Sequence, residues 1–120
     1  METTKLKNAN YTYNGRTYRL CCNMNVIAEV QEAYNGNLLR ALDQRGGLKS
    51  TQTFLAAMLT EAADTQGVKD ADGLPLRITT KEIGRGLTWP ETIKAGKLIW
   101  PLIDDAVHSI AAEPGEDEKN

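Results

Sequence analysis

The sequence of 120 residues predicts a single small α+β domain that is mostly helical, with an N-terminal β-hairpin packed against about four to five α-helices. Two observations carry this prediction. Apolar residues alternate on both sides of an Asn-Gly pair near the N-terminus, and after residue 22 their spacing changes from two residues to about 3.6. A chain of this length can bury one modest core, and its 41% apolar and 25% charged residues are typical of a globular protein.

The hairpin is predicted within residues 5–22 and is centred on Asn14-Gly15 in the stretch YTYNGRTYRL. Both positions of a two-residue type I′ turn need positive φ, which Asn and Gly tolerate. In this register Tyr13 faces Arg16 and Thr12 faces Thr17. Since side chains alternate between faces, the apolar residues share one face: Ala9, Tyr11, Tyr18, Leu20 and Cys22. A hairpin alone is marginally stable, so helices of this chain or another subunit must cover that face.

Residues 21–25, CCNMN, are predicted to form the corner between the second strand and the first helix. Adjacent strand residues point to opposite faces, so Cys21 and Cys22 do not readily bind one metal ion. His108 is the only histidine, which leaves neither a zinc ligand set nor a Cys–His pair. Asn23 is expected to cap the helix, with Cys22 and Met24 turned toward the core. We expect replacement of both cysteines by Ser and Val to leave function largely intact.

Four more helices are predicted after the first one, and two of them lie in the middle of the chain. The first helix ends near Gly36, and a short helix runs from residue 38 to 44 before Gly46-Gly47. Ser50 is expected to cap a central helix with a clear apolar stripe. We expect this stripe to run through the middle of the core: Phe54, Leu55, Met58, Leu59 and Ala62.

The C-terminal third contains two predicted capping boxes after a polar loop over residues 67–78. Each box places a Thr three residues before a Glu, at Thr79 and at Thr88. The last helix carries a narrow apolar seam, with a kink or restart expected at Pro101. The seam consists of Ile93, Gly96, Trp100, Ile103, Val107 and Ile110. We assign residues 1–4 to a flexible N-terminus, 5–112 to the domain and 113–120 to a disordered acidic tail.

Charge and motifs exclude several function classes. Residues 1–100 hold 13 Lys and Arg against 10 Asp and Glu, an excess too small for a nucleic-acid-binding domain. No apolar signal segment or membrane span is present, which predicts a cytoplasmic protein without membrane association. Asp70 and Asp72 lack the Glu of a calcium loop, and Gly84-Arg85-Gly86 lacks the Lys of a phosphate loop. We therefore expect no catalytic residue, no metal and no cofactor.

Two tryptophans are the best candidates for partner contact, because Trp is enriched in binding hot spots. Trp89 and Trp100 both lie in the last helix, and Ile93 follows Trp89 by one turn. The alternative for each tryptophan is a place in the core. Our hypothesis is that Trp89, Ile93 and Trp100 line a groove that binds a helical partner.

The order of elements resembles the tail assembly chaperones of long-tailed bacteriophages and prophages. The resemblance covers residues 5–112 and rests on the hairpin, the stretch NMNVIAEVQEAYNG, the helix FLAAMLTEAA and the segment RITTKEIGRGL. In that family an aromatic residue and then DMN usually stand at the start of the first helix, whereas this chain has Cys22 and Asn23. Thr79, Thr80 and Glu82 match the family's L-T-x-E pattern loosely.

The resemblance implies a non-enzymatic protein in the cytoplasm of the bacterial host. Such chaperones bind the long helical tape-measure protein, keep it soluble and help recruit tail-tube subunits, and many self-associate. An alternative is a tail structural protein that stays in the virion. A small DNA-binding regulator is a further alternative, although the last helix offers only Lys94 and Lys97 near its start.

Overall fold

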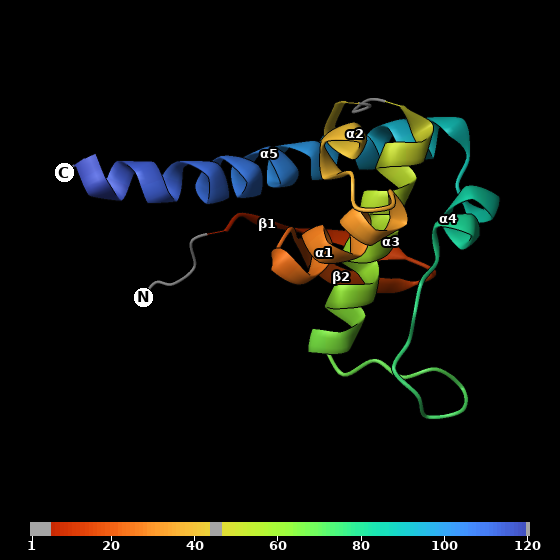
Figure 1. The fold of residues 1–120 in the computed structure, drawn as a ribbon. Coiled ribbons are helices and arrows are strands. Elements are labelled where there is room, and N and C mark those ends of the chain that lie inside the picture. The colour runs from red at the N-terminus through yellow and green to blue at the C-terminus, as the bar shows by residue number, and fades with distance from the viewer. Residues whose placement is uncertain (1–5, 44–46, 120) are drawn as a thin grey trace.

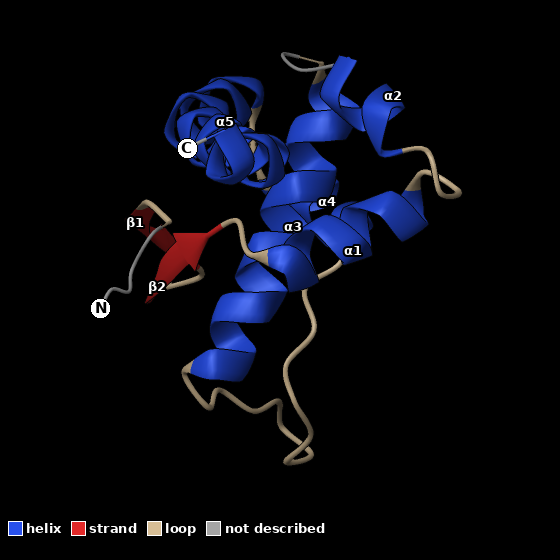
Figure 2. Ribbon diagram, turned by 60° about the vertical axis from the view of Figure 1, so that its left-hand side comes forward, coloured by secondary structure: helices blue, strands red, loops and turns tan. Residues whose placement is uncertain are grey.

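The computed structural model describes residues 6–43 and 47–119, with side chains up to His108. A two-stranded hairpin precedes five helices, as predicted. The central helix α3 (Leu48–Thr65) contacts β2, α1, α4 and α5. Figure 1 shows the hairpin and α1 beside α3, and Figure 2 shows α5 nearly end on, beside the upper part of α3 and above the hairpin. The core therefore lies around α3, between the hairpin and the other helices.

The hairpin has the predicted register. Strands β1 (Asn8–Tyr13) and β2 (Arg16–Cys21) are antiparallel, and Tyr13 faces Arg16 across the turn. Asn14 and Gly15 have φ values of 50° and 78°, as a type I′ turn requires. On the predicted apolar face three residues are buried and two are partly buried: Tyr18, Leu20 and Cys22, then Ala9 and Tyr11. The chain's own helices cover this face.

The corner after β2 matches two expectations and contradicts a third. Asn23 caps α1 (Met24–Ala33), because its Oδ1 accepts the Val26 N–H at 3.1 Å. Cys22 is buried as expected, but Met24 is 60% exposed, so its predicted place in the core is wrong. Successive helix residues are rotated by roughly 100°, and α1 buries the side that carries Val26 and Val30. Met24 therefore lies beside the buried side of α1 and is not part of it.

The start of α3 corrects a second prediction. The N-cap is Gly47, not Ser50. Ser50 lies inside the first turn and is fully buried, where its hydroxyl donates to the Ala41 carbonyl at 3.0 Å and contacts the Tyr34 hydroxyl at 3.0 Å. Ser50 therefore joins α3 to α1 and to α2 (Leu38–Asp43). The predicted break at Gly46-Gly47 lies partly outside the described residues, whereas Gly36 ends the α1 segment with φ of 87°.

The predicted stripe of α3 is confirmed, because all five of its residues are buried: Phe54, Leu55, Met58, Leu59 and Ala62. In the loop that follows, Asp70 Oδ1 accepts the N–H groups of Asp72 and Leu74. This carboxylate thus holds the turn together.

Only one of the two capping boxes closes in both directions. Thr79 caps α4 (Thr80–Gly86) by accepting the Glu82 N–H, but the Glu82 carboxylate accepts from the Tyr13 hydroxyl instead of the Thr79 N–H. Before α5 (Trp89–Lys119), the Glu91 carboxylate accepts the Thr88 N–H at 2.9 Å, and the Thr88 hydroxyl oxygen accepts the Glu91 N–H at 3.3 Å. The start of α5 is therefore fixed locally.

Helix α5 does not restart at Pro101. Pro101 is exposed, and so is Lys97, whose carbonyl loses its helical donor at this point; water can hydrate that carbonyl. The backbone stays helical to Lys119, which differs from the disordered tail predicted for residues 113–120. Within residues 6–43 and 47–119, no helix combines the length and apolar character needed to cross a bilayer.

Candidate protein interaction site

Trp100 is mainly a core residue. It is 7% exposed, and its indole N–H donates to Thr51 Oγ1 at 3.1 Å. Its ring meets Phe54 edge to face, with 5.3 Å between the ring centroids. Trp100 therefore anchors α5 on α3, and only its rim reaches the surface.

Trp89 and Ile93 lie on the outside of the same helix. Trp89 is 65% exposed and Ile93 is 37% exposed. The two residues are four positions apart and so lie one above the other on the helix surface. The buried side of α5 keeps three members of the predicted seam, Gly96, Trp100 and Ile103, and its centre is rotated toward the preceding positions. The other buried residues on this side are Thr92, Ala95, Ile99, Leu102 and Ala106. This rotation leaves Ile93 at the edge of the core, where a partner can reach it.

Ile93 and Trp100 line a shallow groove of about 280 Å³ between α3 and α5, which we call the α3–α5 groove. Leu48, which is also partly exposed, forms the opposite wall. Gly96 forms part of the floor, and a Cβ atom there would lie 3.5 Å from Thr51 and 3.6 Å from Trp100. The structure thus brings two of the three predicted residues into one groove, with Trp89 one helical turn away from Ile93.

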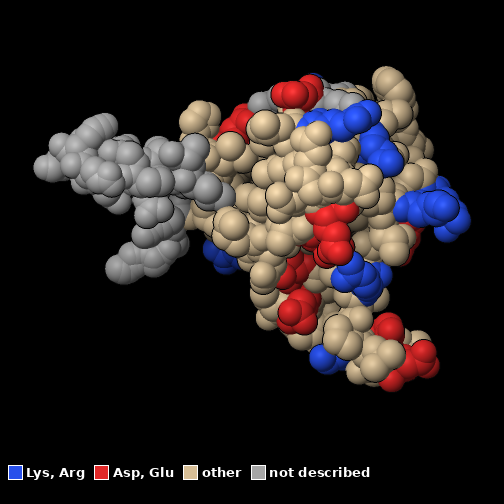
Figure 3. All heavy atoms as spheres, viewed as in Figure 1, with Lys and Arg blue, Asp and Glu red and all other residues tan. Residues whose placement is uncertain are grey.

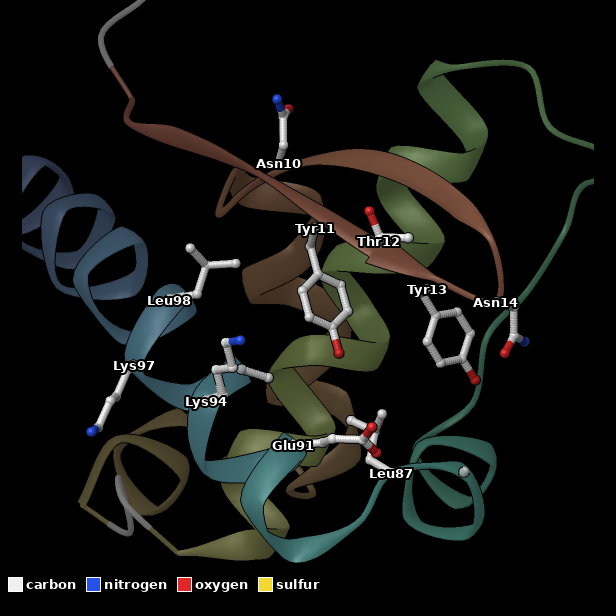
Figure 4. A pocket seen from close by; sticks show the side chains of 12 residues that line it. Asn10, Tyr11, Thr12, Tyr13, Asn14, Leu87, Glu91, Lys94, Lys97 and Leu98 are labelled. Atoms are coloured by element: carbon white, nitrogen blue, oxygen red, sulfur yellow. The ribbon is translucent and has the colours of Figure 1, made fainter.

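A larger groove, which the sequence did not indicate, lies on the other side of α5. This β1–α5 groove has a volume of about 760 Å³. Figure 4 shows Tyr11 and Tyr13 pointing into it from β1, opposite Leu98 of α5 and Leu87. Lys94, Lys97 and Glu91 border it on the α5 side. The only sequence signal was that Tyr11 belonged to an apolar face without an assigned cover.

The two tyrosines of this groove keep their protons at neutral pH. Burial, with the nearby Glu91 carboxylate, raises the pKa of Tyr11. Burial and the 2.9 Å hydrogen bond to Glu82 raise the pKa of Tyr13 to about 12. Both phenols therefore remain neutral groups in a mostly apolar surface.

The two cysteines and His108 were weighed earlier as reactive or metal-binding groups, and their surroundings can now be described. Burial raises the pKa of both cysteine thiols, that of Cys22 to about 12, so the thiolate that a nucleophile needs is disfavoured. His108 is exposed, with its Nδ1 3.0 Å from the Asp104 carbonyl oxygen. In the part of the chain that the structure describes, no three His, Cys, Asp or Glu side chains gather as a metal site would require. The two grooves beside α5 have mainly apolar walls and remain as candidates for a binding site.

Searches of protein-family models, of curated proteins and of solved structures found no match to this chain. The two grooves and the exposed end of α5 are therefore the basis for a functional proposal.

Proposed function

We propose that this chain is a non-enzymatic phage tail assembly chaperone, which binds a tape-measure protein in the bacterial cytoplasm, keeps it soluble and helps recruit tail-tube subunits. The observation that carries the proposal is the exposed apolar surface formed by Leu48, Trp89 and Ile93 beside the α3–α5 groove. The order of elements, a hairpin followed by five helices, also agrees with the family resemblance.

The proposed contact is a helix lying along this surface. An amphipathic helix presents apolar side chains at positions i, i+3 and i+4, and such helices bind in apolar grooves. Trp89 and Ile93 have the matching spacing on α5. The α3–α5 groove of about 280 Å³ can take an apolar side chain between Ile93 and Leu48. A tape-measure protein exposes long amphipathic helices before the tail tube encloses it, so it presents the surface that this site fits.

The test is co-expression with the candidate tape-measure protein. We expect the wild-type chain to raise its soluble yield and Trp89→Ala to abolish most of that gain, because the variant loses an exposed indole without changing the core. Leu74→Ala is the matched control, since Leu74 is 59% exposed but lies in the loop after α3. Equal loss in both variants, or no loss in Trp89→Ala, would contradict the proposed site.

The alternatives lead to different outcomes. A tail structural protein would appear in purified virions by mass spectrometry, whereas a chaperone would be absent. A DNA-binding regulator would give a salt-dependent gel shift; Figure 3 shows basic and acidic side chains interspersed on the face in view, without a continuous basic patch there. Light scattering during size-exclusion chromatography would show whether the chain forms a homo-oligomer.

A further inference from the structure

The outer edge of β2 is closed by one side chain. The Arg19 N–H donates to Gln66 Oε1 at 2.9 Å, and Gln66 Nε2 donates to the Thr17 carbonyl at 3.4 Å. The amide of Gln66 thus pairs with β2 as a neighbouring strand would. These bonds also show that Thr17 and Arg19 direct their main-chain groups away from β1.

The outward groups of β1 follow from the register. Thr12 lies opposite Thr17, and Asn10 lies opposite Arg19. In an antiparallel pair the two residues of a non-hydrogen-bonded pair both turn their N–H and C=O groups outward. Asn10 and Thr12 therefore present these groups at the free edge of β1. Among the described residues, no hydrogen bond outside the hairpin occupies these main-chain groups.

This free edge borders the β1–α5 groove. Asn10 and Thr12 line the groove, yet their side chains belong to the other face of the hairpin. The Thr12 hydroxyl lies 2.9 Å from that of Thr17, and Figure 4 shows the Asn10 side chain pointing away from the cavity. The main chain of these two residues is therefore what faces the groove.

The remaining walls define the chemistry of an occupant. Tyr11 and Leu98 offer apolar surface, and the groove volume of about 760 Å³ can hold several side chains. Lys94 and Lys97 have no ion-pair partner within the described residues, and they outnumber Glu91, the one carboxylate among the described residues that line the groove. The net charge of this wall is therefore positive, and it complements a carboxylate.

We propose that the β1 edge binds an extended peptide segment of a partner protein as a third strand, with an apolar side chain against Tyr11 and Leu98 and an acidic side chain near Lys94 and Lys97. Main-chain hydrogen bonds to a sheet edge supply affinity in such complexes, and alternate side chains supply specificity. β1 has six residues, so it can pair with a short segment. Of the residues that line this groove, only Lys97 also borders the α3–α5 groove, and the proposal stands whether or not the chain is a tail chaperone.

The test is selection of binders from a phage-displayed library of random nonapeptides by the intact chain. We expect selected peptides to alternate apolar and polar residues and to carry an Asp or Glu. Thr12→Pro removes the outward N–H without touching the inward pairs, and proline is tolerated at such edge positions. Thr12→Val, the matched control, loses the same hydroxyl and keeps the N–H.

We expect Thr12→Pro to weaken binding of the selected peptides by about tenfold or more, and Thr12→Val to bind like the wild type. In the wild-type chain, bound peptide should also slow hydrogen exchange of the Asn10 or Thr12 amide, while the Tyr11 amide, already paired with β2, should change little. This second readout keeps the test decisive if the Pro variant fails to fold.

Three outcomes would overturn the proposal. The library yields no binder; the binders leave the Asn10 and Thr12 amides unprotected; or the chain is a dimer that Thr12→Pro converts to a monomer, which would assign the edge to a second copy. Trp89→Ala should not affect peptide binding, so failure here and failure of the proposed chaperone site can be told apart.

Discussion

The two strands of the hairpin pair with each other, but only one of their outer edges is hydrogen-bonded to another part of the chain. The β2 edge is closed by Gln66 at the end of α3, and β2 itself packs on that helix. The β1 edge faces a groove of about 760 Å³ bordered by Lys94 and Lys97. Unpaired edges invite pairing with other chains, so proteins usually protect them. An edge left open beside its protected neighbour indicates a surface kept for binding.

Helix α5 repeats this contrast along its length. Trp89 is exposed at its start, whereas Trp100, eleven residues later, is buried against α3. We call the buried surface packed on α3 the closed side of the molecule, and the exposed surface at β1 and at the start of α5 the open side. Trp100 belongs to the closed side and Trp89 to the open side. The following substitutions test how sharply these two sides differ.

The largest expected effect lies on the closed side. Trp100→Ala removes the packing on Phe54 and leaves the Thr51 hydroxyl without its indole donor. We expect the free energy of unfolding to fall by about 3–5 kcal/mol, as for large-to-small core substitutions. Trp89→Ala, measured alongside by urea unfolding, should change it by less than about 0.5 kcal/mol. Similar losses for both variants would remove the distinction between the two sides.

A smaller effect is expected at the adjacent cysteines. Cys22→Ser buries a hydroxyl among apolar groups and should cost about 1–3 kcal/mol. Cys21→Ser should cost far less, because Cys21 is only partly buried. With the wild-type chain, a thiol reagent should modify Cys21 first and Cys22 only on unfolding. Simultaneous modification of both thiols in the native state would show that Cys22 is not enclosed.

Tyr13 links the hairpin to α4, and its ionisation makes the free energy of unfolding depend on pH in the alkaline range. Its pKa is about 12 in the folded chain against the ordinary value of 10, so both states hold the proton below pH 10. Between about pH 10 and 12 the unfolded chain loses this proton and the folded chain keeps it, so the stabilisation falls as pH rises.

We expect Tyr13→Phe, which lacks the hydrogen bond to Glu82, to be about 1–2 kcal/mol less stable than the wild type at pH 7. The difference should shrink above pH 10 in chemical denaturation series. Stability curves of the two proteins that stay parallel from pH 8 to pH 11 would contradict this assignment.

The smallest change in free energy is expected for Gln66→Ala, which opens the β2 edge. The two lost hydrogen bonds are exposed and should cost about 0.5–1.5 kcal/mol. The variant should nevertheless self-associate with rising concentration in analytical ultracentrifugation, because it then has two free edges. Gln31→Ala is the control, since Gln31 is exposed on α1, away from the sheet. A monomeric Gln66→Ala would show that the edge needs no protection.

The sequence predicted what local rules determine. The Asn14-Gly15 turn set the hairpin register, and the 3.6-residue period set the buried stripe of α3. Local rules failed where a distant partner competed: Ser50 bonds to Ala41 and Tyr34 instead of capping, and Glu82 bonds to Tyr13 instead of closing its box. A propensity scale has no information about such partners.

The candidate site was predictable only in part. An apolar seam at intervals of three and four residues shows that a helix has an inner side, but not how the helix is rotated on its neighbours. The rotation of α5 left Ile93 at the edge and turned Trp100 inward. The β1–α5 groove is formed by residues 10–14 and residues 86–98, and no pattern within either segment predicts that the two lie together.

The position of Gln66 in the chain has a consequence for synthesis on the ribosome. Gln66 follows Arg19 by 47 residues, and chains grow at about 5–20 residues per second. The strand is therefore complete about 2–9 seconds before the residue that closes it has been added, whereas a hairpin forms within microseconds. A nascent chain that forms its hairpin early has two open edges, and the finished protein has one.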